Sequence, residues 1–213
     1  MKYLERVINC GLLEQIKKSA YITAFEQLEI TARNFNKNEA VFFESDEVDK
    51  ICIVDKGSVR SEKVYPNGEA HIVGVFDEGM IFGLEFAVSK KRLAATDFIC
   101  NERSSVIFIS MQSIEKNEYA EGLHKALTYM LADSNIRMSH KLEILAEKGL
   151  RKRIMVYLAV LQGKSGSNTV TLNMNREQLA QFLCVNRSAL SSELSKMRAE
   201  GVIEMNGPKI TVL

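Results

Sequence analysis

The chain has 213 residues, 46% of them hydrophobic, and a formal net charge of +1, so two domains with hydrophobic cores are expected. No apolar run is long enough to span a bilayer, and residues 1–18 mix acidic and basic side chains in an amphipathic pattern, which argues against a signal peptide and favours a soluble cytoplasmic protein. Residues 149–213 carry nine Lys/Arg and four Asp/Glu, a net charge of +5, whereas residues 1–148 carry 19 and 23, a net charge of −4. A basic C-terminal module is expected to bind a polyanion.

The first half of the sequence changes from a helical to a strand-like pattern. Residues 1–36 are predicted to be helical, because apolar residues recur at helical spacing from Leu4 to Ile16. From Glu39 onward, short apolar or alternating runs follow one another, among them KICIVDKGSVRSEKVY, GMIFGLEFAV and SSVIFIS. Turn signals separate the runs, for example at Pro66-Asn67-Gly68. Six or more short strands with regular turns predict a small antiparallel sandwich or jelly roll.

A second helical region is predicted from Glu115 to Lys148. It contains a narrow seam of residues three to four apart, namely Leu123, Leu127, Leu131, Ser134, Met138, Leu142 and Leu145. Charged flanks on both sides of the seam favour a two-stranded coiled coil across a symmetric dimer. The alternative is a helix packed on its own domain. Gly149 is predicted to end this helix and to act as a hinge.

The C-terminal region is predicted to contain a helix, a strand and a terminal hairpin around a helix pair. The helix covers Arg151–Leu161, the loop GKSGSN follows, and TVTLN is a short strand. The last segment, GVIEMNGPKITVL, is typical of a β-hairpin with Asn206-Gly207 at its tip.

Between these elements, REQLAQFLCVNRSALSSELSKMRAEGVIE predicts two short helices that meet at a turn containing Cys184. Asn175 and Gln178 have the spacing of a capping box for the first helix, and Asn186 is the predicted cap of the second. Small Ala180 would let the two helices cross closely. Leu190, Leu194 and Met197 follow the 4-3 spacing of a buried face.

The opposite face of the second predicted helix is small, polar and basic. Such a helix can enter the major groove of DNA, where Arg187 can donate two hydrogen bonds to a guanine and serines can reach bases or phosphates. Arg176, at the start of the first helix, is expected to meet phosphate. The candidate DNA-binding residues are Arg176, Asn186, Arg187, Ser188, Ser191, Ser192 and Lys196. An ordinary surface helix pair is the alternative, but the terminal hairpin and the positive charge favour a winged helix-turn-helix.

This order of elements resembles the Crp/Fnr family of bacterial transcription regulators over nearly the whole chain. FGLEFAV and NREQLAQFLCVNRSALSSELSKMRAEGVIE carry the resemblance. It implies an α+β fold: a double-stranded β-helix (jelly roll) sensor domain similar to cyclic-nucleotide-binding domains at 1–114, a dimerisation helix at 115–148, and a winged helix-turn-helix DNA-binding domain at 149–213. It also implies a homodimer through residues 115–148 on a two-fold symmetric double-stranded DNA operator, RNA polymerase as a candidate partner, and no catalytic role.

Two departures from the family concern the DNA-binding residues. The family turn often carries Gly where Cys184 stands. The best-known members place Arg-Glu at the start of the recognition helix and a second Arg four residues past that Glu. Here Arg187 keeps the first place, whereas Ser188 and Ser192 replace the Glu and the second Arg. The operator is therefore expected to differ from the operators of those members.

The sensor segment also departs from the members that bind cyclic nucleotide. In those members a Glu holds the ribose hydroxyl and an Arg holds the cyclic phosphate, but here Leu84 and Ala94 stand at or near these places. We therefore expect a more hydrophobic small-molecule effector than cyclic AMP, or none. The alternative is a cyclic AMP sensor in which a shifted Arg92 or Glu85 reaches the ligand. The candidate effector residues are Gly83, Glu85, Phe86, Arg92, Ala94 and Ser139.

Other sensing chemistries have weaker support in the sequence, and no catalytic residue, metal site or cofactor is predicted. The four cysteines, Cys10, Cys52, Cys100 and Cys184, form no CxxC pair, which argues against a disulfide framework and a local iron–sulfur site. A single strand histidine, His71, cannot supply the ligand cluster of a cupin enzyme. Cys184 is interpreted as a small buried thiol, and the alternative is a thiol whose oxidation weakens DNA binding.

Overall fold

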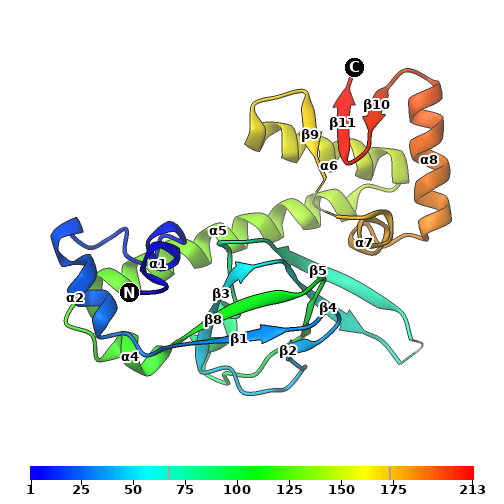
Figure 1. The fold of residues 1–213 in the computed structure, drawn as a ribbon. Helices are drawn as coiled ribbons and strands as arrows, with labels where there is room; N and C mark the ends of the chain where they lie inside the picture. Colours follow the sequence, from blue (N-terminus) through cyan, green and yellow to red (C-terminus); the bar gives the residue numbers. More distant parts are fainter. Residues whose placement is uncertain (67, 173) are drawn as a thin grey trace. The chain divides into compact units, whose positions relative to one another are not determined.

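The computed structural model describes residues 1–66, 68–172 and 174–213, and Figure 1 shows its fold. The chain divides into two compact units, Met1–Ser134 and Asn135–Leu213. The boundary falls inside the longest helix, α5 (Ala120–Ala146). None of the helices in the described ranges is long and apolar enough to cross a membrane.

The N-terminal unit begins with short helices, α1 (Leu4–Asn9), η1 (Lys18–Ala20) and α2 (Tyr21–Glu26). The prediction of helix as far as residue 36 is wrong in its last part, because strand β1 (Ile30–Phe35) starts there. β1 pairs along its full length with β8 (Ser104–Ser110), and Ile30 lies opposite Ile109. The backbone hydrogen bonds of this ladder come from a segment far along the chain, so local helical spacing could not reveal them.

Two antiparallel four-stranded sheets form the predicted sandwich, which the structure confirms. One sheet has the order β1-β8-β3-β6, with β3 at Lys50–Lys56 and β6 at Ile81–Phe82. The other has the order β2-β7-β4-β5, with β2 at Ala40–Phe42, β7 at Asp97–Cys100, β4 at Val59–Val64 and β5 at Ala70–Phe76. The turn predicted at Pro66-Asn67-Gly68 lies partly outside the described residues, at Asn67.

Strand β3 is buried on both of its faces. Cys52 and Val54 belong to a core between the sheets, together with Phe82 and Phe98. Because side chains alternate along a strand, Ile51 and Ile53 point to the other face. There they share a second core with the N-terminal helices and the start of α5, with members such as Val7, Phe25 and Leu123. The continuous apolar run ICIV therefore reflects a strand shared by two cores.

The segment FGLEFAV does not continue as a strand, contrary to the sequence interpretation. Gly83 has a φ of 73°, in the left-handed region, and the short helix α3 (Leu84–Ala87) follows it. Left-handed backbone interrupts a strand and is adopted most readily by glycine. α3 buries Leu84 and Ala87 in the core beside β3.

The helical region predicted at 115–148 is interrupted near its start. α4 (Met111–Glu115) ends there, and α5 begins only at Ala120. Between them, the Asn117 side chain donates to the Ala24 carbonyl at 2.8 Å and accepts from the Tyr119 amide at 3.0 Å. The Asn117 side chain thus links the end of α2 to the start of α5, and the helix is interrupted at this point.

The seam predicted on α5 is wrong in its first half. Leu123 and Leu127 are 0% and 2% exposed, in the core of the N-terminal unit. The alternative interpretation, a helix packed on its own domain, holds for this part. Further along, Met138 and Leu142 are 44% and 64% exposed.

In the described part of the C-terminal unit, three further helices and one small sheet follow α5. They are α6 (Leu150–Ser165), α7 (Arg176–Phe182), α8 (Arg187–Ala199) and the antiparallel sheet β10-β11-β9, with β9 at Thr169–Thr171, β10 at Ile203–Asn206 and β11 at Lys209–Val212. The predicted loop GKSGSN is partly helical, because α6 continues until Gly166 ends it with a left-handed φ of 64°. Gly149 is the extended N-cap residue of α6 and does not terminate α5. In the predicted strand TVTLN, Asn173 lies outside the described residues.

Candidate nucleic-acid interface

The first helix of the pair, α7, starts with the predicted capping box. The Asn175 side chain accepts from the Gln178 amide at 2.9 Å, and the Gln178 side chain accepts from the Asn175 amide at 2.9 Å. These two bonds satisfy backbone donors that a helix N-terminus leaves without partners. Leu179 and Ala180 are buried, so α7 is held at its start by the cap and along its side by the core.

The turn between α7 and α8 is held by backbone and side-chain hydrogen bonds. The Val185 amide donates to the Ala180 carbonyl at 2.9 Å, and the Arg153 guanidinium donates to the Leu183 carbonyl at 3.1 Å. Cys184 has a φ of 54°, the left-handed conformation in which the family often uses glycine. The interpretation of Cys184 as a buried thiol is wrong, because the residue is exposed at this tight turn.

The amine of Lys141, on α5, lies under the same turn and was not noticed in the sequence. Lys141 is only 9% exposed, and its Nζ atom lies 4.3 Å from the centre of the Phe182 ring. Burial lowers the pKa of Lys141 to about 8, against a smaller opposing contribution from the charge of Cys184. The sequence offers only one signal for this buried amine, namely a polar residue at a helical position that otherwise faces a core.

The second helix, α8, buries one face and exposes the other, as predicted. Leu190, Leu194 and Met197 are at most 1% exposed and join the core of the C-terminal unit. The exposed candidate residues are Asn186, Arg187, Ser188, Ser191, Ser192 and Lys196. Asn186 occupies the N-cap position, but its side chain makes no capping hydrogen bond, so the predicted side-chain cap is wrong. The structure thus brings six candidates onto one helix and its cap.

The two candidate arginines differ in their surroundings. Arg187 is exposed, and its Nε atom lies 3.9 Å from a carboxylate oxygen of Glu177. Arg176 is half-buried, and its Nη2 atom lies 3.3 Å from the sulfur of Met205 on the hairpin. Its Nη1 atom is buried and has no hydrogen-bond partner in the described ranges. Arg187 is therefore exposed beside one loosely paired carboxylate, whereas Arg176 is held between α7 and the hairpin.

The terminal hairpin forms as predicted, but its turn is shifted by one residue. Asn206 pairs with Lys209, so Gly207-Pro208 is the two-residue turn. Gly207 has a φ of 58°. An Asn206-Gly207 tip would make Pro208 the closing residue of the turn, whose N–H must donate back across the hairpin, and proline has no N–H.

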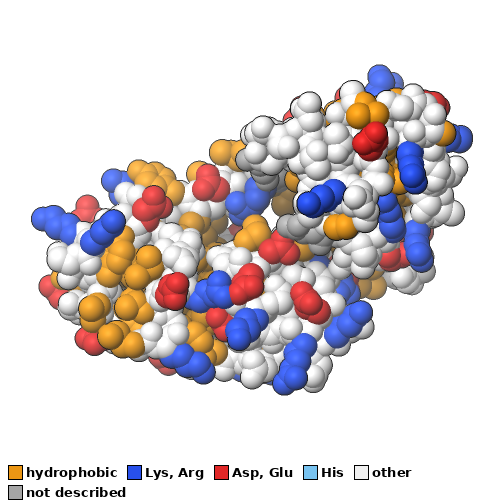
Figure 2. Space-filling view, turned by 45° about the horizontal axis from the view of Figure 1, so that its top comes forward, with side chains coloured by type: hydrophobic (Ala, Val, Ile, Leu, Met, Phe, Trp, Pro, Cys, Tyr) orange, Lys and Arg blue, Asp and Glu red, His pale blue; other side chains and the backbone are white. Residues whose placement is uncertain are grey.

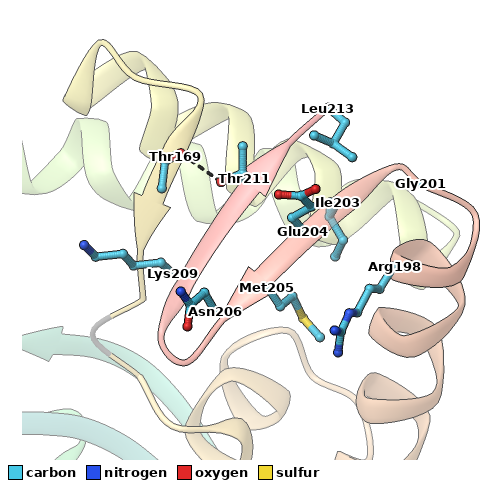
Figure 3. Close-up of a pocket in the computed structure, with 10 residues that line it drawn as sticks. All are labelled: Thr169, Arg198, Gly201, Ile203, Glu204, Met205, Asn206, Lys209, Thr211 and Leu213. Carbon is cyan, nitrogen blue, oxygen red and sulfur yellow. Dashed lines mark hydrogen bonds between the residues drawn. The ribbon is translucent and has the colours of Figure 1, made fainter.

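A shallow hollow of about 650 Å³ lies over the hairpin and the end of α8 (Figure 3). Arg198 on α8 and Lys209 on β11 stand at its two ends, and Glu204 lies between them. Thr169 and Thr211 also line it, and their hydroxyl groups are 2.8 Å apart. The hollow therefore carries the charged side chains of Arg198, Lys209 and Glu204 around a sheet surface that is partly polar and partly apolar.

The acidic side chains of this unit are partly neutralised by Arg151 at the start of α6. Its guanidinium donates to Glu193 at 2.5 Å and to Glu200 at 2.5 and 3.1 Å, which ties α6 to α8. Hydrogen bonding to Arg151 lowers the pKa of Glu200. On the face seen in Figure 2, the C-terminal unit, at the upper right, shows more Lys and Arg than Asp and Glu side chains. The local field favours a polyanion.

In the jelly roll of the N-terminal unit, called the roll below, the candidate effector residues do not form a polar site. Leu84 and Ala94 are 4% and 3% exposed, in an apolar core. Glu85 and Arg92 are both exposed, and the Arg92 guanidinium lies 3.7 Å from Glu115. The two positions where the family resemblance implies charged nucleotide contacts therefore carry buried apolar side chains, and the nearby charged residues are exposed.

The remaining candidates of the roll lie against aromatic side chains. Gly83 and Phe86 are linked by a backbone hydrogen bond of 3.2 Å, and the Phe86 ring lies 6.0 Å from that of Phe98. Phe82 stacks on Phe98 at 5.2 Å. Ser139 belongs to the other unit, where its hydroxyl donates to the Asn135 carbonyl at 3.1 Å. An effector at Gly83 and Phe86 would therefore meet an apolar wall.

The thiols of Cys10, Cys52 and Cys100 lie in environments that disfavour the thiolate. Burial raises the pKa of Cys10 to about 11 and raises those of Cys52 and Cys100, so these thiols stay protonated. Within the described ranges, no group of three His, Cys, Asp or Glu residues could hold a metal ion.

A β-roll followed by a long helix and a winged helix-turn-helix defines a DNA-binding transcription regulator, and comparison with known proteins agrees. Residues 32–116 match the family model of the cyclic nucleotide-binding domain, and residues 152–213 match that of the Crp-like helix-turn-helix domain. The chain belongs to the Crp/Fnr family of transcription regulators.

Among individual proteins, the global nitrogen regulator of Synechococcus elongatus is 23% identical over 197 residues, which cover 87% of each protein. The structure of a mutant of CooA from Carboxydothermus hydrogenoformans has a TM-score of 0.75 at 16% identity and covers 95% of this chain and 91% of that one. FixK2 from Bradyrhizobium japonicum has a TM-score of 0.71 at 20% identity and covers 87% and 93%. At these identities, the two structures support the fold alone.

Proposed function

We propose that the protein binds a two-fold symmetric DNA operator as a homodimer and changes transcription in response to a signal received by the roll. In this proposal, residues 1–114 are the sensor, residues 115–148 the dimerisation helix and residues 149–213 the DNA-binding module of a cytoplasmic regulator. RNA polymerase is the candidate partner on which the bound dimer acts.

One observation carries the proposal: α8 presents an exposed face of small, polar and basic side chains while Leu190, Leu194 and Met197 fix its other face in the core. A helix of this kind fits the major groove because no bulky apolar side chain obstructs its approach. The cap of α7, the turn and the hairpin hold α8 from three sides, so its orientation is preorganised within the unit.

The candidate residues divide into two roles. Arg187 is assigned to base contacts, because an exposed arginine can donate two hydrogen bonds to guanine. Ser188, Ser191 and Ser192 line the same face. Arg176, whose Nη1 atom is buried with no partner in the described ranges, is assigned to a phosphate, which supplies an acceptor. Asn186 and Lys196, at the two ends of the exposed face, are assigned to the flanking backbone.

Selection of binding sequences from a random pool of duplex DNA tests this function. The expected result is an inverted repeat whose half-sites are centred about 10 base pairs apart or a multiple of that distance. Affinity for the selected site is expected to fall steeply with salt, because phosphate contacts release counterions. A pool without a shared sequence, or a single unrepeated half-site, would contradict the proposal.

We propose further that the roll is controlled by a small molecule other than cyclic AMP and more hydrophobic than a nucleotide. This follows from the burial of Leu84 and Ala94 and from the phenylalanine rings near Gly83. Glu85, Arg92 and Ser139 are the polar side chains proposed to contact it. The loss of two charge-assisted hydrogen bonds weakens nucleotide binding by a few powers of ten.

Calorimetry with cyclic AMP and cyclic GMP tests this second part. No binding is expected at micromolar nucleotide, and operator affinity should not change. A one-per-subunit isotherm in the low micromolar range that Arg92→Ala abolishes would show that the shifted arginine holds the phosphate. The DNA-binding proposal does not depend on this outcome.

A further inference from the structure

One side of α5 shows a regular stripe of side chains that differs from the seam predicted from the sequence. Its members alternate at intervals of four and three residues: His124, Thr128, Leu131, Asn135, Met138, Leu142 and Leu145. We call this set the α5 stripe. The seam predicted from the sequence broke this alternation, and its members Leu123 and Leu127 are buried in the N-terminal unit.

The α5 stripe has the spacing of a two-stranded coiled coil. Leu142 and Met138 are 64% and 44% exposed in the single chain, and Leu131 and Leu145 are half-buried. A strict 4-3 repeat is complementary to itself, because the side chains of one helix fit between those of an identical helix. The occupant that suits this surface is therefore a second copy of the chain. Thr128, Asn135 and Leu142 then take the a positions, and the other four members take the d positions.

The positions beside the stripe cannot set the alignment of two such helices by charge. Coiled coils usually fix their register through opposite charges at e and g. Here the e positions are Lys125, Ala132, Ser139 and Ala146, and the g positions are Leu127, Ser134 and Lys141. Leu127 and Lys141 are buried within their own units, and none of the seven is acidic. Alignment must come from the stripe itself.

We propose that Asn135, the central a residue, pairs with the same residue of the second copy and fixes a parallel, in-register α5 dimer. The inference rests on the proposed dimer and adds to it the residue that specifies its geometry. Asn135 is exposed, and an amide carries both donors and an acceptor, so two of them can hydrogen-bond across a two-fold axis.

Other alignments leave the amide without a partner of its own kind. A slip of one heptad places Asn135 against Leu142 or Thr128, and an antiparallel pair places an a residue against a d residue such as Leu131 or Met138. A buried amide that lacks its hydrogen bonds destabilises these alignments, by about tenfold or more in the dimer dissociation constant. The parallel in-register pair is two-fold symmetric and also brings the C-terminal ends of both α5 helices, from which the DNA-binding modules continue, to the same end of the pair.

Sedimentation equilibrium of the full chain tests the inference with two substitutions at the same residue. Asn135→Asp changes one atom, and two carboxylates at the axis repel, so the dissociation constant should rise at least tenfold at pH 7 and recover by pH 5, where the pair retains a proton. Asp133→Asn makes the reverse change on another side of α5 and should leave the constant unchanged. Asn135→Val should tighten association about tenfold, because it removes the amide from an apolar interface.

The outcomes separate this inference from the dimer on which it rests. Leu142→Glu is expected to abolish association. A wild-type chain that stays monomeric would refute the dimer itself. A wild-type dimer that Leu142→Glu dissociates, but whose constant is the same in Asn135→Asp and Asn135→Val, would overturn the role of Asn135 alone.

Discussion

The recognition helix α8 and the short helix α3 of the roll are both segments for which the sequence suggests a family function, yet their polar residues are arranged in opposite ways. Around α8 the apolar residues are buried and every candidate contact except the fixed Arg176 is exposed. Around α3 the positions that hold the ligand in nucleotide-binding relatives are themselves the buried apolar ones, Leu84 and Ala94.

The two segments therefore differ in where their apolar residues lie: α8 keeps a polar exposed face, whereas the two positions in the roll are apolar and buried. Leu84 and Ala94 contribute to the apolar core of the N-terminal unit. α8 needs the same kind of core on one side, but its exposed side contributes little to stability and remains available for contacts. Similarity to the cyclic nucleotide-binding domain therefore supports the architecture and not the ligand.

The largest effect is expected from Leu84→Glu. This substitution places a carboxylate where nucleotide-binding members of the family carry one. We expect the free energy of unfolding of the roll to fall by about 3–5 kcal/mol, because the new charge is buried without a partner. Urea unfolding at pH 7 measures this. The loss should be smaller at pH 4, where the carboxyl is largely protonated in both states. A stable variant that gains cyclic AMP binding would break the contrast.

Arg187→Ala tests the exposed face of the recognition helix α8. The variant should lose about 1–3 kcal/mol of binding free energy at the selected operator and should relax preference at one base pair per half-site. Titration of the operator and of random DNA at the same salt concentration measures both. Arg176→Ala is the matched control, because loss of a phosphate contact should weaken all sequences alike and reduce the salt dependence. Equal losses on both DNAs in Arg187→Ala would refute its role in base contacts.

Lys141→Met tests the buried amine that packs against Phe182 in the helix-turn-helix. Burial lowers the folded-state pKa of Lys141 from 10.5 to about 8, so burying the charged amine costs stability in full below pH 8, and the cost falls as pH rises toward 10.5. We expect Lys141→Met to raise the free energy of unfolding at pH 7 by about 1–2 kcal/mol, since loss of the cation–π contact offsets part of the gain. The advantage over wild type should shrink between pH 8 and pH 10.5 in chemical denaturation. A constant difference over this range would contradict the assignment.

Glu177→Gln should have the smallest effect. The Arg187–Glu177 pair is 3.9 Å apart with side chains 66% and 57% exposed, so its loss should change stability by less than about 0.5 kcal/mol. Removal of the carboxylate frees Arg187 and takes one negative charge from the DNA-facing surface. DNA affinity should therefore rise slightly at low salt and converge with wild type at high salt. A fall in operator affinity would indicate that Glu177 itself orients Arg187.

The sequence predicted best where neighbouring residues determine the structure. Asn175 and Gln178 belong to one turn, and their capping box formed as expected. Leu190, Leu194 and Met197 share a face because helix geometry alone places them there. The strands of the roll were likewise predicted from their alternation and turns.

The predictions that failed depend on partners distant in the sequence. Strand β1 exists because β8 supplies its hydrogen bonds, and Leu127 is buried because the N-terminal helices reach it. Periodicity on α5 showed which residues share a face, but not which of two apolar faces the chain itself covers. Lys141 is similar, since only packing against Phe182 distinguishes it from a solvated lysine.

The conformation of the turn before α8 has a practical consequence. Of the four cysteines, Cys52 and Cys100 are buried, Cys10 is half-buried, and Cys184 alone is exposed. A maleimide dye added to the native protein should therefore attach first beside the recognition helix, without any engineered residue. Its fluorescence would report directly when DNA arrives at that surface, and protection of the thiol from alkylation would map the same contact on the unlabelled chain.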